Sequence, residues 1–69
     1  MSSGMYEEIG RIARQNWNSV ITFGELAEMI GVNSAWHAGQ QVECAWRYFD
    51  RRGDTRTCAA ISRVFHGKN

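Results

Sequence analysis

The chain has 69 residues, of which 43% are hydrophobic and 22% charged, and its formal net charge at pH 7 is +1. A chain of this length can bury one small core, so we expect a single domain over residues 1–69. No apolar run is long enough to span a bilayer, and the first ten residues lack the basic and then apolar layout of a secretory signal. We therefore expect a cytoplasmic protein with no membrane partner.

The charges are distributed unevenly along the chain. Residues 1–46 hold two arginines against five acids, a net charge of −3, whereas residues 47–69 hold five arginines and one lysine against two aspartates, a net charge of +4. A basic segment of this kind suits a polyanion. The alternative is an ordinary solvated surface without a charged partner.

Two cysteines and two histidines are the only residues that hint at a metal. A disulfide-built scaffold of this size normally carries four or more cysteines, so we expect Cys44 and Cys58 to be reduced. With His37 and His66 they form a set whose gaps of six, thirteen and seven residues lack the close ligand pairs of structural zinc sites. We predict no metal and no cofactor.

The first helix is predicted over residues 4–16, because Met5, Ile9 and Ile12 fall at helical spacing. Ser2 or Ser3 is a suitable N-cap. The polar stretch at residues 15–19 should end the helix, and Trp17 within it is expected to plug the edge of the core.

The second helix is predicted over residues 23–30. Thr22 is a favourable N-cap, and Glu25 three residues later completes a capping-box pattern. Gly31 falls where a left-handed residue ends a helix, and Val32 is placed to pack back onto the helix that it follows.

The third helix should begin after Asn33 or Ser34 and stop near Arg52, before the turn signal of Gly53. Its apolar residues recur at intervals of four, three and four and are Ala38, Val42, Ala45 and Phe49.

The last segment, residues 57–67, has two interpretations. We favour a short helix that Thr57 caps and Gly67 ends, because the adjacent Val64 and Phe65 fit one helical stripe. Residues 57–65 also alternate in polarity, and a strand there would form a short C-terminal β wing.

Residues 20–31, VITFGELAEMIG, resemble the helix-turn-helix opening of bacterial regulators and of the winged-helix half of alkyltransferase-like DNA repair proteins. The residues that match the packing and turn positions of these families are Leu26, Ala27, Ile30, Gly31 and Val32. The resemblance implies an all-α, three- to four-helix, helix-turn-helix-like domain that binds DNA.

The chain also departs from this pattern. His37 and Gln40 stand where a recognition helix of standard length carries apolar residues, so either the turn is longer by about one residue or the helix does not read DNA. The Pro-Cys-His-Arg nucleophile motif of active alkyltransferases is missing, since Cys44 lies in VECAW and Cys58 in RTCAA. No other catalytic set emerges, and we expect no enzymatic activity.

A helical wheel of the third helix, with its apolar stripe turned inward, places Trp36, Gln40, Glu43, Arg47 and Arg51 outward. Arginine and glutamine suit phosphates and base edges, whereas Glu43 disfavours phosphate. Trp36 alternatively folds back against the rest of the protein. The predicted binding residues are Trp36, His37, Gln40, Gln41, Arg47, Arg51, Arg52, Arg56 and Arg63.

Two functional hypotheses follow. The first is a small bacterial or phage regulator that binds double-stranded DNA through its third helix, grips phosphate with its basic C-terminal third, and works as a homodimer on two half-sites. The second is a protein-interaction module, such as a phage-encoded modulator of a host protein, that uses Trp17, Trp36, Tyr48 and neighbouring arginines.

Overall fold

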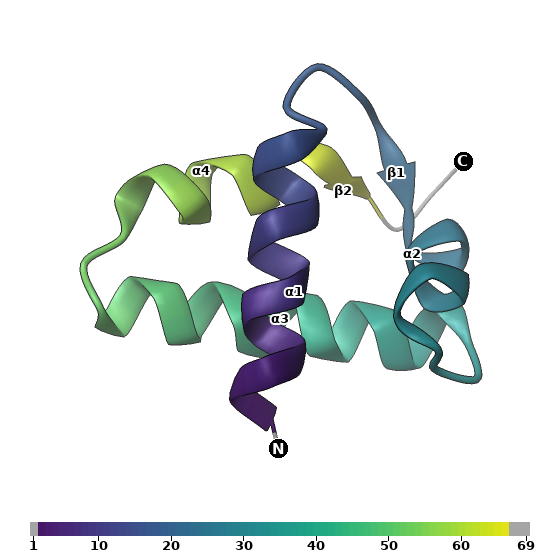
Figure 1. The fold of residues 1–69 in the computed structure, drawn as a ribbon. Coiled ribbons are helices and arrows are strands. Elements are labelled where there is room, and N and C mark those ends of the chain that lie inside the picture. Colours follow the sequence, from purple (N-terminus) through teal and green to yellow (C-terminus); the bar gives the residue numbers. More distant parts are fainter. Residues whose placement is uncertain (1, 67–69) are drawn as a thin grey trace.

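A computed structural model describes residues 2–66, and the side chains of residues 4–66 (Figure 1). The elements are α1 (Ser2–Gln15), β1 (Ile21–Thr22), α2 (Phe23–Ile30), α3 (Ala35–Arg51), α4 (Thr55–Val64) and β2 (Phe65–His66). The prediction of a mostly helical domain is therefore confirmed, with a two-stranded sheet added to it. None of the helices in this part of the chain is long and apolar enough to cross a membrane.

The helices surround one core. The long helix α3 packs against each of the other three helices, and α1 crosses it while also packing on α4 (Figure 1). Each helix contributes fully or nearly fully buried apolar side chains, among them Ile9, Leu26, Ala45, Phe49, Ile61 and Val64. Burial of these stripes is what stabilises helices as short as α2 and α4.

The two strands join distant parts of the chain. They pair in parallel, with Ile21 opposite Phe65 and Thr22 opposite His66. Ile21 and Phe65 are both buried, so the pairing is supported by apolar contact as well as by backbone hydrogen bonds. The end of α4 is thereby fixed to the segment that leads into α2 (Figure 1).

The first helix begins two residues earlier and ends one residue earlier than predicted. Its end has a local cause, because the side-chain amide of Asn16 donates to the carbonyl oxygen of Ile12 at 2.8 Å. The proposed capping by Ser2 or Ser3 lies outside the described side chains. The prediction that Trp17 plugs the edge of the core is wrong, since Trp17 is 42% exposed and is not among the side chains packed against the core.

The second helix matches its prediction at both ends. Thr22 accepts from the backbone N–H of Glu25 at 3.1 Å, and the Glu25 carboxylate accepts from the backbone N–H of Thr22 at 2.9 Å. Gly31 is left-handed, with φ of 77°, and its N–H donates to the carbonyl oxygen of Ala27. Val32 is half-buried against the core, as predicted.

The third helix is capped by Ser34 and ends at Arg51, close to its predicted end. The fourth helix begins earlier than predicted, and its N-cap is Asp54 rather than Thr57. Thr57 is instead buried and donates its hydroxyl to Asp54. The helical interpretation of the last segment is confirmed up to Val64, and the interpretation of residues 57–65 as a strand is wrong; a two-residue strand, Phe65–His66, follows the helix instead. Gly67 lies outside the described residues.

Candidate functional site

The face of α3 that points away from the core carries four of the residues that were predicted to bind a partner, namely Trp36, Gln40, Arg47 and Arg51. Ser34 starts the helix by accepting from the backbone N–H of His37 at 3.2 Å. The stripe of Ala38, Val42, Ala45 and Phe49 is then buried, as predicted. We call the opposite, exposed side the outward face, and it consists of Trp36, Gln40, Glu43, Arg47 and Arg51.

Trp36 lies at the N-terminal end of the outward face and is 68% exposed. The alternative in which it folds back onto the protein is therefore wrong. Its ring meets the imidazole of His37 edge to face, with 5.3 Å between the ring centroids. His37 is tied to the helix cap, because its Nδ1 lies 3.0 Å from the hydroxyl oxygen of Ser34.

The remaining polar residues of α3 differ in their exposure and in whether they are already paired with another side chain. Gln40 is exposed, whereas Gln41 is half-buried on the flank of the helix. Arg47 forms an ion pair with Glu43 at 3.0 Å, which reduces the positive charge in the middle of the outward face. Arg51 has no hydrogen-bond or ion-pair partner within residues 4–66 and is available to a ligand.

Arg52 was predicted to bind a partner, but the structure gives it an internal role. Its Nη1 lies 3.3 Å from the Glu7 carboxylate and also contacts the hydroxyl of Tyr48. Tyr48 donates to the same Glu7 oxygen at 2.7 Å, and this bond, together with burial, raises the pKa of Tyr48. The three side chains connect α1 to α3.

The basic residues of α4 lie in a different part of the molecule from the start of the outward face. Arg63 stacks over the ring of Trp17 and donates to its backbone carbonyl oxygen at 2.8 Å. Arg56 lines a pocket of about 360 Å³ together with Arg14, Trp17 and Ala60. We call this the arginine pocket. Sequence reasoning found Arg56 and Arg63 but missed Arg14, which comes from the acidic half of the chain.

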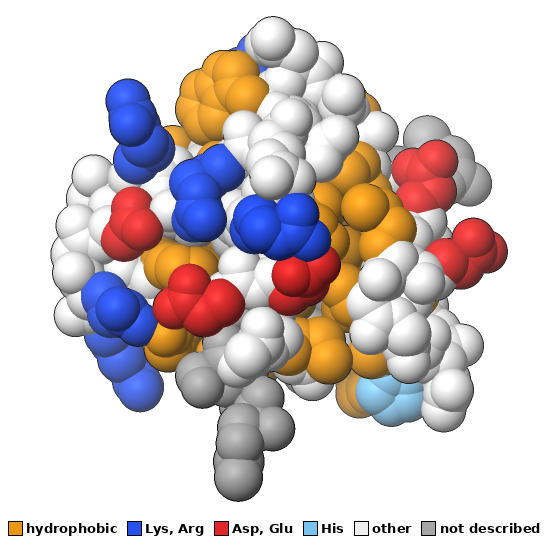
Figure 2. Space-filling model, in the orientation of Figure 1, with side chains coloured by type: hydrophobic (Ala, Val, Ile, Leu, Met, Phe, Trp, Pro, Cys, Tyr) orange, Lys and Arg blue, Asp and Glu red, His pale blue; other side chains and the backbone are white. Residues whose placement is uncertain are grey.

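The surface shows where these charges gather. In Figure 2 the basic side chains lie over α1, α4 and the C-terminal end of α3, with acids between them. The edge over α2 carries acidic side chains. The uneven charge along the sequence thus has a counterpart on this face of the folded molecule.

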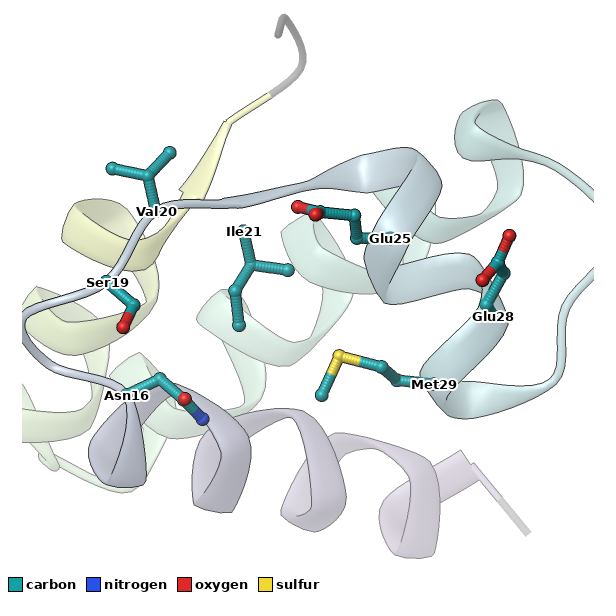
Figure 3. Close-up of a pocket in the computed structure, with 7 residues that line it drawn as sticks. All are labelled: Asn16, Ser19, Val20, Ile21, Glu25, Glu28 and Met29. Carbon is teal, nitrogen blue, oxygen red and sulfur yellow. The ribbon is translucent and has the colours of Figure 1, made fainter.

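A hollow of about 510 Å³ lies between the α1–β1 connection and α2, as Figure 3 shows. Met29 and Ile21 point into the space between α1 and α2, while Val20 points away from it. Glu25 and Glu28 stand at the rim. Two carboxylates make this hollow unfavourable for a polyanion.

A second apolar region was not found from the sequence. Phe23, Val42, Trp46, Ile61 and Phe65 line a groove of about 600 Å³ between α3 and the end of α4. Trp46 is 38% exposed along it. Val42 and Trp46 both lie on α3, whereas Phe23, Ile61 and Phe65 come from distant segments, so the pattern of the third helix alone does not predict the groove.

The cysteines are free thiols, as expected. Cys58 is buried, which raises the pKa of its thiol, and it donates to the carbonyl oxygen of Trp46 at 3.4 Å. No group of three or more histidine, cysteine or acidic side chains within the described residues is arranged to hold a metal ion.

Comparison of the chain with protein-family models, with curated proteins and with solved structures finds no match.

Proposed function

We propose that the protein is a small helix-turn-helix-like DNA-binding protein, of the kind found among bacterial and phage regulators, in which α3 contacts the duplex. The observation that carries the proposal is the outward face. It keeps Trp36, Gln40 and Arg51 exposed along one side of a 17-residue helix whose other side is buried.

The connection between α2 and α3 supports this proposal. It holds four residues, 31–34, and helix-turn-helix motifs use turns of three or four residues. One additional residue in the turn moves the first buried position from His37 to Ala38 and the second from Gln40 to the half-buried Gln41, so the turn length accounts for part of the departure seen in the sequence. His37 and Gln40 are then free of the core because of the turn length.

The dimensions of α3 also suit a groove of DNA. At a rise of about 1.5 Å per residue, the outward face extends roughly 22 Å between Trp36 and Arg51. A major groove about 12 Å wide admits a single α-helix. Gln40 offers an amide to base edges, and Arg51 offers a guanidinium to phosphate.

Glu43 limits how the helix can be used. Its ion pair with Arg47 sits in the middle of the outward face and disfavours phosphate at that point. We therefore expect phosphate contact near Arg51 and base contact near Gln40. A domain of this size buries little surface on DNA, so binding two half-sites as a homodimer would add affinity and specificity.

A protein partner is the second candidate, and one observation favours it. Trp36 exposes an indole on the same helix face as the Glu43–Arg47 ion pair, whose charges offset each other, and tryptophan is among the residues that dominate protein interfaces. In this alternative, Trp36→Ala weakens binding to the partner more than the loss of either arginine on the outward face.

The test is binding of random-sequence duplex DNA at low and at physiological salt. We expect salt-sensitive binding with a dissociation constant in the micromolar range or tighter, because phosphate contacts release counterions. Arg51→Gln should weaken binding to all sequences and reduce the salt slope by about 1. The matched control is Arg11→Gln, which removes the same charge from the exposed surface of α1.

No detectable binding at low salt would exclude the DNA proposal and leave the protein partner. Equal loss of binding in the Arg11 and Arg51 variants would mean that net charge, rather than the outward face, accounts for the affinity. The molar mass of the protein and of its complex should be measured in the same buffers. If the protein binds as a homodimer, we expect two protein chains on one two-fold symmetric duplex.

A further inference from the structure

The arginine pocket combines positive charge with an exposed aromatic ring. Its walls come from α1, the turn that follows it, and α4, and they include no residue of the outward face. Its volume of about 360 Å³ lies within the range of small-molecule sites. The pocket is therefore separate from the surface that we propose contacts DNA.

Two guanidinium groups of the pocket are available to an anion. Arg14 donates from Nη1 to the hydroxyl oxygen of Thr57 at 3.0 Å, which uses one of its five N–H donors and fixes its position. Arg56 is exposed and makes no hydrogen bond or ion pair within the described part of the chain. Planar guanidinium groups match the geometry of a phosphate and bind it through paired N–H donors.

The carboxylate of Asp54, which lies at the start of α4, accepts its hydrogen bonds from Thr57 and not from the arginines of the pocket. Asp54 accepts from the backbone N–H of Thr57 at 3.0 Å and from its hydroxyl at 2.7 Å. No ion pair joins Asp54 to Arg14, Arg56 or Arg63 within residues 4–66. Arg56 therefore has no ion-pair partner within these residues, whereas the positive charge of Arg14 is partly offset by the nearby carboxylate of Asp54.

Trp17 supplies the aromatic wall. The Arg63 guanidinium stacks over it, 5.1 Å from the ring centroid, and also binds its backbone carbonyl oxygen. These two contacts fix the position of the indole, which is 42% exposed and is not part of the hydrophobic core. An exposed and fixed indole beside cationic groups is the arrangement that proteins use to stack a nucleic-acid base.

We propose that the arginine pocket binds a nucleotide, with Arg14 and Arg56 on the phosphate and the base against Trp17. The same chemistry is presented by a free nucleoside monophosphate and by one nucleotide of a single strand. A base paired within a duplex does not present it, because its faces are covered by its neighbours.

The experiment is a titration of the isotopically labelled protein, followed by the nuclear magnetic resonance signals of the backbone amides and the three indole N–H groups. Adenosine 5′-monophosphate is the probe, with adenosine and inorganic phosphate as its two halves. A short single-stranded oligodeoxyadenylate, added separately, distinguishes a strand from the free nucleotide as the source.

We expect the nucleotide to shift the signals of Trp17, Arg14 and Arg56 and to bind more tightly than either half. Arg56→Gln should weaken binding about tenfold or more, and Trp17→Leu about fivefold or more. Arg51→Gln removes the same charge from the outward face and should leave nucleotide binding unchanged. Circular dichroism of each variant checks that the fold is retained.

Three results would overturn the proposal. They are the absence of shifts at the pocket with the nucleotide and with the single strand, equal binding of inorganic phosphate and the nucleotide, and equal effects of the Arg51 and Arg56 substitutions. Failure here is distinguishable from failure of the DNA proposal, because duplex binding depends on Arg51 and nucleotide binding on Arg56.

Discussion

Two glycines of α1 differ in what lies beside them. A methyl group at Gly4 would meet nothing within 4 Å, whereas at Gly10 it would lie 2.5 Å from the ring of Phe49 and 3.0 Å from Thr57. Phe49 is buried, so its ring has little room to move. Gly10 is thus needed where α1 crosses α3 and α4.

We predict that Gly10→Ala lowers the free energy of unfolding by up to about 2 kcal/mol, because an overpacking cost of roughly 1–3 kcal/mol outweighs the gain in helix propensity of about 1 kcal/mol. Gly4→Ala, in the same helix, should be neutral or stabilising. Urea unfolding followed by circular dichroism measures both. Equal stability of the two variants would show that α1 can shift to accommodate the methyl group.

Asp54 is the residue whose charge should matter most to α4. The backbone N–H of Thr57, and next its hydroxyl, lower the pKa of this carboxyl from its ordinary value of 3.8. A group whose pKa is lower in the folded state stabilises the fold fully above the unfolded-state pKa, and this contribution is lost as the pH falls through the folded-state pKa.

We therefore predict that the stability difference between the natural protein and Asp54→Asn is constant above about pH 5 and becomes less favourable to the natural protein below about pH 4. Urea unfolding of both proteins at pH 7 and pH 3 tests this. The other acidic residues are the same in both proteins, so their contributions to the pH dependence cancel when the two free energies of unfolding are subtracted. At pH 7, Asp54→Ala should cost about 1 kcal/mol, as is typical of a lost N-cap. A difference that does not change with pH would mean that the charge of Asp54 is not responsible.

At the scale of the elements, Gly31 decides how α2 ends and where α3 begins. Its φ of 77° is strained for residues with a side chain, and asparagine tolerates it better than alanine. We predict a loss of about 1 kcal/mol or more in Gly31→Ala and a smaller loss in Gly31→Asn. The matched control is Gly24→Ala, where the added methyl group would lie 3.9 Å from the nearest atom.

Thermal unfolding of the three variants gives the order of stability. If Gly31→Ala were as stable as Gly24→Ala, the left-handed conformation would not be needed to join the two helices. The prediction bears on function as well, since the turn length sets which side chains of α3 face outward.

The elements that the sequence predicts well are those specified by residues close together in the chain. The capping box of Thr22 and Glu25, the glycine at position 31 and the stripe of α3 each involve neighbours within a few turns. The start of α4 was misplaced because Thr57 and Asp54 are both suitable caps, and the choice depends on the burial of Thr57. Strand β2 could not be predicted from its own two residues, since its partner β1 lies more than forty positions earlier.

The same distinction applies to the candidate sites. The outward face follows from the helical angle, and its five residues were predicted from the sequence. Gln41 and Arg52 were predicted to bind a partner from outside this face, and Gln41 is half-buried. Arg52 has a contact with Glu7 that is 45 positions away in the sequence. The arginine pocket depends on the contact of α1 with α4, in which Arg14 and Thr57 are 43 positions apart. Arg56 and Trp17 were therefore predicted to contact a partner one by one, whereas Arg14 was missed.

At the scale of the whole molecule, β2 closes the core. Phe65 is 5% exposed and pairs with Ile21 across the sheet. Removing a buried phenylalanine side chain typically costs about 3–5 kcal/mol. A single core in a chain below about 70–80 residues rarely supplies more than that in total.

We therefore predict that Phe65→Ala is largely unfolded at 37 °C, and that Phe65→Leu remains folded with a reduced melting temperature because it keeps most of the buried volume. Val20→Ala is the control, since Val20 is 66% exposed one residue before β1 and should change stability by less than about 0.5 kcal/mol. Circular dichroism during thermal unfolding measures all three. A Phe65→Ala variant that unfolds cooperatively near the melting temperature of the natural protein would show that the four helices hold the core by themselves, and that the parallel strand pair follows from the fold without stabilising it.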